Sequence, residues 1–232
     1  MKNILLAILF LALAFTVPFF FYEVLIFLVA KLGAGWVFGT IYIRLLVIIL
    51  TAISFYLIFQ AIPKTRKLKF MWVFLIALGP GFGISFIAPI YQGDYGMFSS
   101  DFKPSYFSDL DDKTGSKITS NNSKKLVAFF TTTCPHCKVA SNNLGYNLEA
   151  GQALEVNAFF PGTKEDADKF ISTNNGKEFN YYTINDDDFF LGLSGNYFPS
   201  IFLLDENNAP LYHWAGEGVN FTCLDYLLDL EP

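Results

Sequence analysis

Cysteine is absent from the first 133 residues of this 232-residue chain, and all three cysteines lie in the remainder. A membrane protein that passes dithiol electrons across a bilayer needs thiols in its membrane helices or loops, so the N-terminal part cannot be such a relay. Acids are also scarce there: residues 1–91 contain Glu23 and seven Lys or Arg, a net charge of +6. Residues 92–232 carry nine Lys and twenty acids, a net charge of −11, which argues against nucleic acid as a partner.

Long apolar runs fill residues 1–91 and predict a membrane anchor of about three helices, because about 20 helical residues cross a bilayer. The runs cover about residues 4–30, 35–62 and 70–91. Pro18 lies in the first run, and a Gly-Pro-Gly-Phe-Gly sequence at 79–83 predicts a kink in the third. A cleaved signal peptide is the alternative for the first run, because Lys2 precedes its apolar core. The run continues well beyond a signal peptide, which favours a retained helix.

Positive charge sets the expected orientation of these helices. Lys64, Arg66, Lys67 and Lys69 crowd the connection between the second and third runs, and such clusters stay cytoplasmic. The third helix would then export the chain from about residue 92 onward. We therefore expect a multi-pass protein of the inner (cell) membrane, embedded in the lipid bilayer, with a periplasmic C-terminal domain in an oxidising compartment.

Two charges, Glu23 and Arg44, stand inside the apolar runs. Both lie about ten residues from the Gly33–Gly35 turn, so an antiparallel hairpin would place them at similar depth. Intramembrane charges are expensive and tend to pair within a bundle. The pair could join two helices, or it could form a polar pocket for a quinone-like molecule or a partner protein.

Residues 92–121 are rich in Asp, Ser, Gly, Asn and Lys and predict a polar linker, with one short element near 105–110. Residues 122–232 read as one domain with the element order β-α-β-α-β-α-β-β-α. The expected strands are 126–131, 154–160, 179–184, 200–204 and 211–214, and the expected helices are 135–148, 164–173, 186–193 and 219–230. Alternating units favour parallel strands with covering helices, and the late hairpin adds an antiparallel edge. The fold class is therefore α/β with a mixed central sheet.

The sequence Cys134-Pro135-His136-Cys137 follows the first strand of this domain and opens its first helix. Two thiols three residues apart at a helix N-terminus are typical of a thiol–disulfide exchange centre, because the helix dipole and free amides favour a thiolate. Proline is allowed in the first helical turn, and His136 adds an ionisable neighbour. A structural disulfide and half of a zinc site are the alternatives, but zinc needs a second ligand pair.

The other residues of these types are His213 and Cys223, whose spacing does not form such a pair. We interpret His213 as an ordinary edge residue of the last strand. Cys223 shares a helix face with Leu227 and Leu230, so we interpret it as a small buried apolar residue.

The element order and the dithiol together resemble the thioredoxin superfamily over residues 122–232. Phe198-Pro199-Ser200 matches the family's second signature, which implies a cis-proline at Pro199 that faces the dithiol and binds substrate together with Phe198. Gly216 stands where the family often has glycine. The dithiol resembles that of DsbA-type oxidants, and the tethered domain resembles TlpA-type reductases. The membrane part is weakly similar to the DoxX/MauE group of redox-associated membrane proteins.

One position departs from the family pattern. Many members carry an acidic proton acceptor six residues before the first cysteine, and Ala128 stands there in this chain. The family mechanism implies that Cys134 forms a mixed disulfide and that Cys137 resolves it, with no cofactor beyond the Cys134–Cys137 disulfide. The acceptor of the Cys137 proton is left unidentified.

We therefore expect a membrane-anchored extracytoplasmic thiol–disulfide oxidoreductase that acts on envelope proteins and depends on a separate redox partner protein. Whether it reduces or oxidises its substrates stays open. The alternative from a different class is a copper metallochaperone or assembly factor, because soft thiolates suit Cu(I). It would use Cys134 and Cys137 with His136 or His213.

Overall fold

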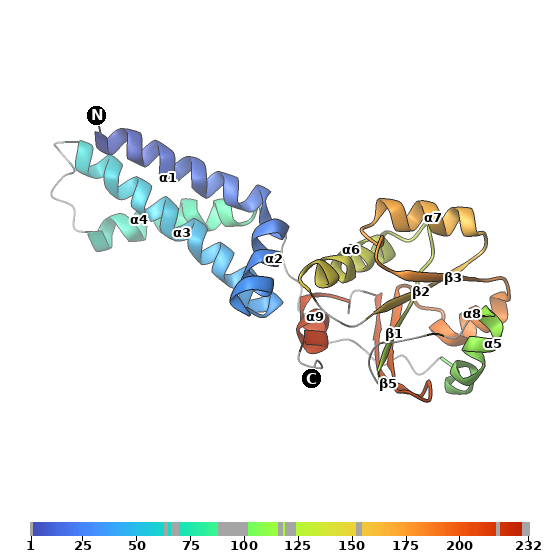
Figure 1. The fold of residues 1–232 in the computed structure, drawn as a ribbon. Helices are drawn as coiled ribbons and strands as arrows, with labels where there is room; N and C mark the ends of the chain where they lie inside the picture. The colour runs from blue at the N-terminus through green and yellow to red at the C-terminus, as the bar shows by residue number, and fades with distance from the viewer. Residues whose placement is uncertain are drawn as a thin grey trace. The chain divides into compact units, whose positions relative to one another are not determined.

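The computed structural model describes residues 2–62, 65, 70–87, 102–115, 118, 124–151, 155–216 and 219–228. The chain forms two compact units, Met1–Tyr91 and Gln92–Pro232 (Figure 1). The division falls where the net charge of the sequence changes sign. Each unit is described below by itself.

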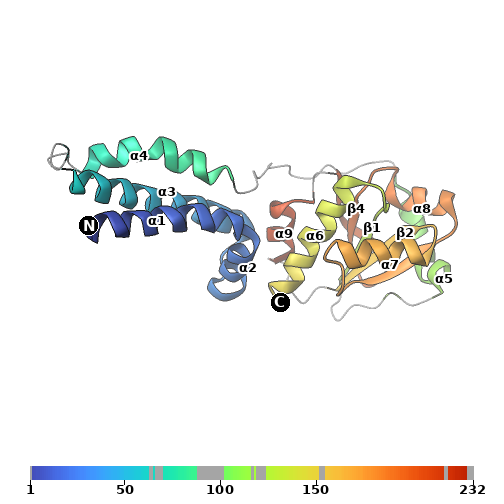
Figure 2. The ribbon, with the colours of Figure 1, turned by 90° about the horizontal axis from the view of Figure 1, so that it is seen from above.

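The described residues of the first unit form four apolar helices: α1 (Lys2–Phe19), α2 (Phe21–Leu32), α3 (Trp36–Ala61) and α4 (Phe70–Ser85). Helix α3 packs against both α1 and α4 (Figure 2). The Ser54 hydroxyl on α3 donates a hydrogen bond to the Ala7 carbonyl of α1 at 2.8 Å. On the other side, a Cβ at Gly81 of α4 would lie 3.1 Å from the Ile48 Cα, so this glycine permits the close approach of the two backbones.

The first apolar run is not one straight helix. It breaks at Phe20, and the two parts are bent by 82° relative to each other. Pro18 lies in the last turn of α1 and has no amide hydrogen to donate, which weakens the helix there. Helix α2 buries Phe21, Leu25 and Val29, which are spaced by one helical turn each and form one face.

Three membrane-spanning helices are predicted, which is more than the described residues contain. Only Trp36–Ala61 is long and apolar enough by itself to cross a membrane. The bent pair Asn3–Phe19 and Phe21–Leu32 meets the same test when it is counted as one span, and Met71–Ser85 is a shorter apolar helix. Residues 88–91 of the third predicted helix lie outside the described residues, as do the basic residues Lys64, Arg66, Lys67 and Lys69.

Arg44 has a partner at the end of α4. Its Nη1 donates a hydrogen bond to the Ser85 carbonyl at 2.7 Å, and its guanidinium lies 5.9 Å from the centre of the Phe86 ring. The last carbonyls of a helix have no partner within the helix, so this contact satisfies one of them. Glu23 is exposed on α2, beyond the bend. These contacts of Arg44 are therefore with the end of α4, and its pairing with Glu23 stays a prediction.

The second unit contains a five-stranded sheet in the order β3-β2-β1-β4-β5. The strands are β1 (Lys125–Phe129), β2 (Val156–Pro161), β3 (Asn180–Ile184), β4 (Ser200–Leu204) and β5 (Pro210–Ala215). The pairs β1–β2 and β2–β3 are parallel, whereas β1–β4 and β4–β5 are antiparallel. The predicted mixed sheet and the predicted order of strands and helices are confirmed.

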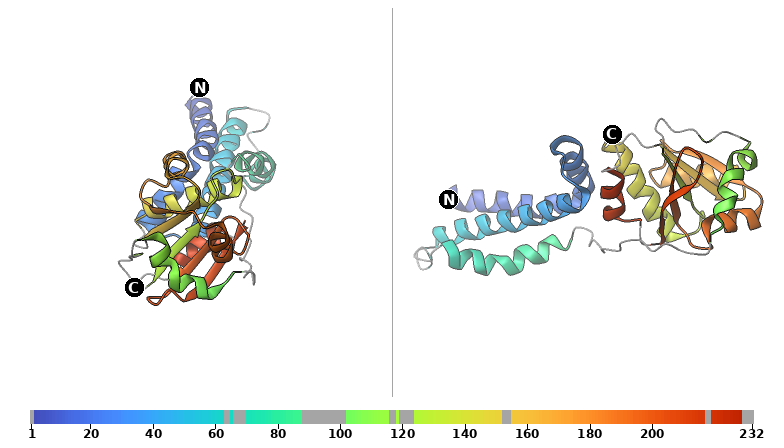
Figure 3. Two further views of the ribbon diagram at one scale, coloured as in Figure 1. Left: turned by 90° about the vertical axis from the view of Figure 1, so that its right-hand side faces the viewer. Right: turned by 90° about the horizontal axis from the view of Figure 1, so that it is seen from below.

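Helices cover both faces of this sheet. They are α6 (Pro135–Glu149), α7 (Lys164–Thr173), α8 (Asp187–Ser194) and α9 (Phe221–Leu228), together with the 3-10 helix η1 (Pro104–Asp109) and α5 (Leu110–Thr114). Figure 3 shows α6 and α9 on one side of the sheet and α5 and α8 on the other. Helix α7 lies on the α6 side, where Phe170 contacts the rings of Phe130 and Phe160.

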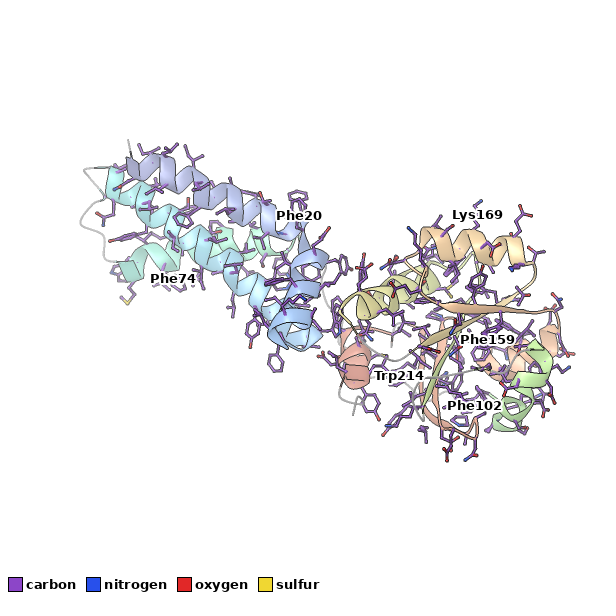
Figure 4. The ribbon with its side chains drawn as sticks, in the orientation of Figure 1. Phe20, Phe74, Phe102, Phe159, Lys169 and Trp214 are labelled. Carbon is purple, nitrogen blue, oxygen red and sulfur yellow. The ribbon has the colours of Figure 1, made fainter. Side chains whose placement is uncertain are left out.

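Residues 102–115 and 118 pack on the second unit and supply part of its core, so the prediction of a linker over 92–121 is wrong for them. Phe107, Leu110 and Ile118 are fully buried in one cluster with strand and α8 residues. Phe102, marked in Figure 4, packs its ring against Phe202 at 4.9 Å between ring centres. The short element expected near 105–110 is confirmed as η1 and the start of α5.

Two polar contacts also fix this segment to α8. The Lys103 amide donates to the Gly192 carbonyl at 2.7 Å, and the Lys113 ammonium lies 2.8 Å from the Asp186 carboxylate. The segment therefore covers the sheet face that α6, α7 and α9 leave open, and its contacts with α8 help to hold that helix in place. Helix α8 leads directly into the loop that carries Pro199.

Candidate active site

The dithiol lies where the central strand β1 gives way to α6. The Phe130 amide still donates to the Phe159 carbonyl of β2 at 2.9 Å, and a short threonine segment then leads to Cys134. Cys134 is the N-cap of α6, and its sulfur accepts a hydrogen bond from the Cys137 amide at 3.3 Å. Pro135 occupies the first helical turn, where no intrahelical amide donor is needed. The Cys134 sulfur thus receives the amide and dipole stabilisation that helix N-termini offer to anions.

The two cysteines differ in their environments. Cys134 is partly exposed, whereas Cys137 is fully buried, and this burial raises the pKa of the Cys137 thiol to about 12. Thr131, in the segment that precedes the dithiol, lowers the pKa of Cys137 and so opposes that rise. The site therefore pairs one accessible sulfur with one shielded sulfur that stays protonated near neutral pH.

The loop before β4 faces the accessible sulfur. The Cys134 thiol donates to the Phe198 carbonyl at a sulfur–oxygen distance of 3.7 Å, and the peptide bond between Phe198 and Pro199 is cis. The Pro199 carbonyl accepts a hydrogen bond from the Gly216 amide at 2.8 Å. The Phe198 ring stacks on Phe190 of α8 with 5.6 Å between centres. The loop is therefore held by α8 on one side and by the end of β5 on the other.

A buried Ser–His pair lies directly behind this loop. The Ser200 Oγ and the His213 Nε2 are 2.7 Å apart, and the His213 ring stacks on Phe202 with 4.0 Å between centres. His213 is 2% exposed, and burial lowers its pKa to about 4. His213 does lie on the edge strand, as expected, but its side chain points into the core. The sequence contained no signal for this, because a lone histidine on a strand has no fixed partner.

The remaining candidates are placed as follows. His136 is exposed in the first turn of α6, beside Cys134 in the chain. Cys223 is 2% exposed on α9, which confirms its interpretation as a buried residue, and burial raises the pKa of its thiol. Tyr197, which the sequence did not single out, precedes Phe198 and is 52% exposed.

The copper hypothesis gains no support from the arrangement. Among the described residues, no group of three or more His, Cys, Asp or Glu side chains is placed to hold a metal ion. His213, one of the two histidines available, is engaged by Ser200 inside the core. A site built from the dithiol and His136 would have to use the shielded Cys137 sulfur.

The sheet order, the dithiol at the N-terminus of the helix after the central strand, and the facing X-Pro loop together define the architecture. The second unit has a thioredoxin-like fold. Neither a scan against protein-family models nor a search of curated proteins found a match.

Among solved structures, StoA from Bacillus subtilis shares 18% identity with a TM-score of 0.41, covering 50% of this chain and 92% of that one. A secreted Mycobacterium tuberculosis disulfide oxidoreductase, described as homologous to E. coli DsbE, shares 13% identity with a TM-score of 0.40, covering 47% and 82%. A putative thiol:disulfide interchange protein DsbE from Chlorobium tepidum shares 22% identity with a TM-score of 0.38, covering 53% and 85%. These likenesses are distant, so the fold assignment rests on the topology of the thioredoxin-like unit itself. The likeness of residues 1–91 to the DoxX/MauE group stays a prediction.

Proposed function

We propose that this chain is a thiol–disulfide oxidoreductase whose redox centre is the Cys134–Cys137 pair. The observation that carries the proposal is the position of the Cys134 sulfur, which accepts the Cys137 amide at 3.3 Å and faces the Phe198 carbonyl at 3.7 Å. A partly exposed sulfur at a helix N-terminus is suited to nucleophilic attack as a thiolate. The buried neighbouring thiol is suited to an intramolecular second step.

In the reducing direction, the Cys134 thiolate attacks a substrate disulfide. A bond forms between Cys134 and one substrate sulfur, while the substrate S–S bond breaks and its other sulfur leaves as a thiolate that takes up a proton. Cys137 then loses its proton and attacks the Cys134 sulfur. The Cys134–Cys137 disulfide forms, and the second substrate thiol is released. Two electrons pass to the substrate, and an oxidant runs the same steps in reverse.

Phe198 and Pro199 would bind the substrate segment that carries the reacting sulfur. Proline has no amide hydrogen, so the loop offers backbone carbonyls rather than a donor at that position. An extended substrate backbone can pair with such a loop, as in other cases of strand addition. The exposed His136 would place an ionisable group next to the mixed disulfide, where it can influence the charge of the leaving sulfur.

The membrane setting is part of the same proposal. Residues 1–91 would anchor the chain in the lipid of the inner membrane, with the thioredoxin-like unit on the extracytoplasmic side. The length and apolar character of α3 and the basic connection over 64–69 support this orientation. The substrates would then be thiols and disulfides of envelope proteins, and a separate protein would restore the dithiol or the disulfide after each cycle.

Trapping in cells tests the function directly. Full-length Cys137→Ala should accumulate mixed disulfides through Cys134, because the resolving step is missing, and the double variant that also carries Cys134→Ala should not. A reduction potential near roughly −270 mV or lower would mark a reductase, and one near about −120 mV an oxidant. If Cys137→Ala forms no adducts and the wild type reduces no insulin, the proposal is wrong. Tight one-to-one Cu(I) binding in that case would favour the metallochaperone.

A further inference from the structure

Helix α2 departs from the direction of the helix that precedes it. The break at Phe20 bends α2 by 82° relative to α1, so the two helices are nearly perpendicular. Figure 1 shows α2 running from the end of α1 toward the start of α3. Leu25 of α2 packs so closely on the first turns of α3 that a Cβ at Gly39 would collide with its side chain. Helix α2 therefore lies across the ends of α1 and α3, whereas α1 and α3 pack side by side.

The lengths of these helices agree with a crossing that does not include α2. At about 1.5 Å per residue, the 18 residues of α1 span about 27 Å, close to the roughly 30 Å of the hydrocarbon core of a bilayer. Joined in one line, α1 and α2 would span about 45 Å. The 26 residues of α3 span about 39 Å, so some of its turns extend beyond the core. Helix α1 can therefore cross the core without α2.

The surface of α2 has two unlike faces. One face is buried, with Leu25 at its centre. The opposite face carries Glu23, Phe27 and Lys31, which are spaced by about one helical turn each and are all exposed. Charged side chains are costly in the hydrocarbon core, whereas charged and aromatic side chains are both tolerated in the headgroup region, where amphipathic helices lie in the plane of the membrane. The outer face of α2 thus suits the headgroup region better than the core.

Positive charges in the sequence give the side of the membrane. Lys2 begins α1, and the basic residues over 64–69 follow α3. Such charges favour the cytoplasmic side, so the other ends of α1 and α3 would face outward. Because α2 connects those outer ends, it would lie on the extracytoplasmic side.

We propose that α2 is an interfacial helix that lies in the plane of the membrane among the lipid headgroups of the extracytoplasmic side. Its buried face packs on the ends of the other helices, and the Glu23–Phe27–Lys31 face contacts headgroups and water. The first apolar run then crosses the membrane with α1 alone. The inference rests on the proposed membrane anchor of residues 1–91 and does not depend on the redox chemistry.

Thiol labelling of single-cysteine variants tests the position of α2. The background is the full-length chain with Cys134→Ala, Cys137→Ala and Cys223→Ala, which is suitable because labelling reports position and needs no activity. Glu23→Cys and Lys31→Cys are then labelled in right-side-out membrane vesicles with a charged maleimide that does not cross membranes. Maleimides react with thiolates, which form in water and hardly at all in hydrocarbon.

Leu9→Cys in α1 and Ile49→Cys in α3 are matched controls. Their side chains are 53% and 50% exposed, but they lie near the middle of their helices. We expect Glu23→Cys and Lys31→Cys to react at least about tenfold faster than both controls, since a thiol pKa that is lower by one unit gives ten times the thiolate. In inverted vesicles, all four variants should react slowly. Ala30→Cys, a small change at an exposed position of α2, replaces either variant that fails to accumulate.

The outcomes are distinguishable. Labelling of Glu23→Cys and Lys31→Cys as slow as that of the controls would place α2 in the hydrocarbon core, as part of a broken span, and would overturn the inference. Faster labelling in inverted vesicles than in right-side-out vesicles would overturn the extracytoplasmic placement. Equally fast labelling of Leu9→Cys and Ile49→Cys would overturn the membrane anchor itself, and the thiol–disulfide proposal for the second unit would still stand.

Discussion

Burial of His213 should make the stability of the thioredoxin-like unit depend on pH in the acid range. Its pKa falls from the ordinary 6.5 to about 4 in the folded state. Between these values the unfolded chain binds a proton that the folded chain does not, so stability is complete above about pH 6.5 and is lost as the pH falls toward 4. At about 1.4 kcal/mol per pKa unit, the loss amounts to about 3 kcal/mol.

Urea denaturation of residues 92–232 measures this loss. Trp214 is the one tryptophan of that part of the sequence and is 6% exposed, so its fluorescence reports unfolding. The matched control is His213→Gln, which has a side-chain amide to bond with Ser200 but no group that titrates. Carboxylates titrate in both proteins, so the difference between the two stability curves isolates the histidine. Parallel curves between pH 7 and 4 would refute the reasoning.

Three more predictions concern stability of the same unit. The reduced wild type should lose stability relative to Cys137→Ser as the pH rises from 9 toward 12, by up to about 1.4 kcal/mol per pH unit. The reason is that the Cys137 thiol ionises at lower pH in the unfolded chain than in the folded one. Equal curves of stability against pH for the two proteins would contradict the burial of Cys137. Phe107→Ala should cost about 3–5 kcal/mol in urea unfolding, whereas the exposed Ser105→Ala should cost almost nothing. A small effect of both would show that Phe107 is not part of the core. Gly192→Ala would place a Cβ 2.6 Å from the Tyr106 ring and should cost about 1–3 kcal/mol, a loss that Tyr106→Ala should relieve in the double variant.

The parts of the fold that the sequence predicts well are those with strong local signals. Helix α7 has its expected bounds because the Thr163 hydroxyl caps it, accepting from the Asp166 amide at 3.2 Å, and Asn174 ends it. The dithiol also lies where it was expected, since Pro135 starts a helix and a buried strand precedes it. Signals of this kind act over four or five residues and do not depend on distant partners.

The parts of the fold that the sequence predicts wrongly depend on contacts with residues far away in the chain. Phe102, Phe107 and Ile118 lie in a stretch rich in polar residues, and they become core residues because β4 and α8 present an apolar face to them. The bend at Phe20 was missed for a related reason. Pro18 marks a weak point in the helix, but whether the chain bends there depends on the packing of α2 against α3. The Ser200–His213 pair likewise needs the strand register before it can be seen.

The burial of Cys223 limits which disulfides we expect in the folded protein. Three cysteines allow three possible intramolecular pairings, and two of them involve Cys223. Its thiol is 2% exposed in α9, and burial raises its pKa, so it supplies little thiolate for disulfide exchange in the folded unit. We therefore expect the folded unit to have one oxidised isomer. A strong oxidant should convert the reduced protein to a single product that needs no isomerase to correct it.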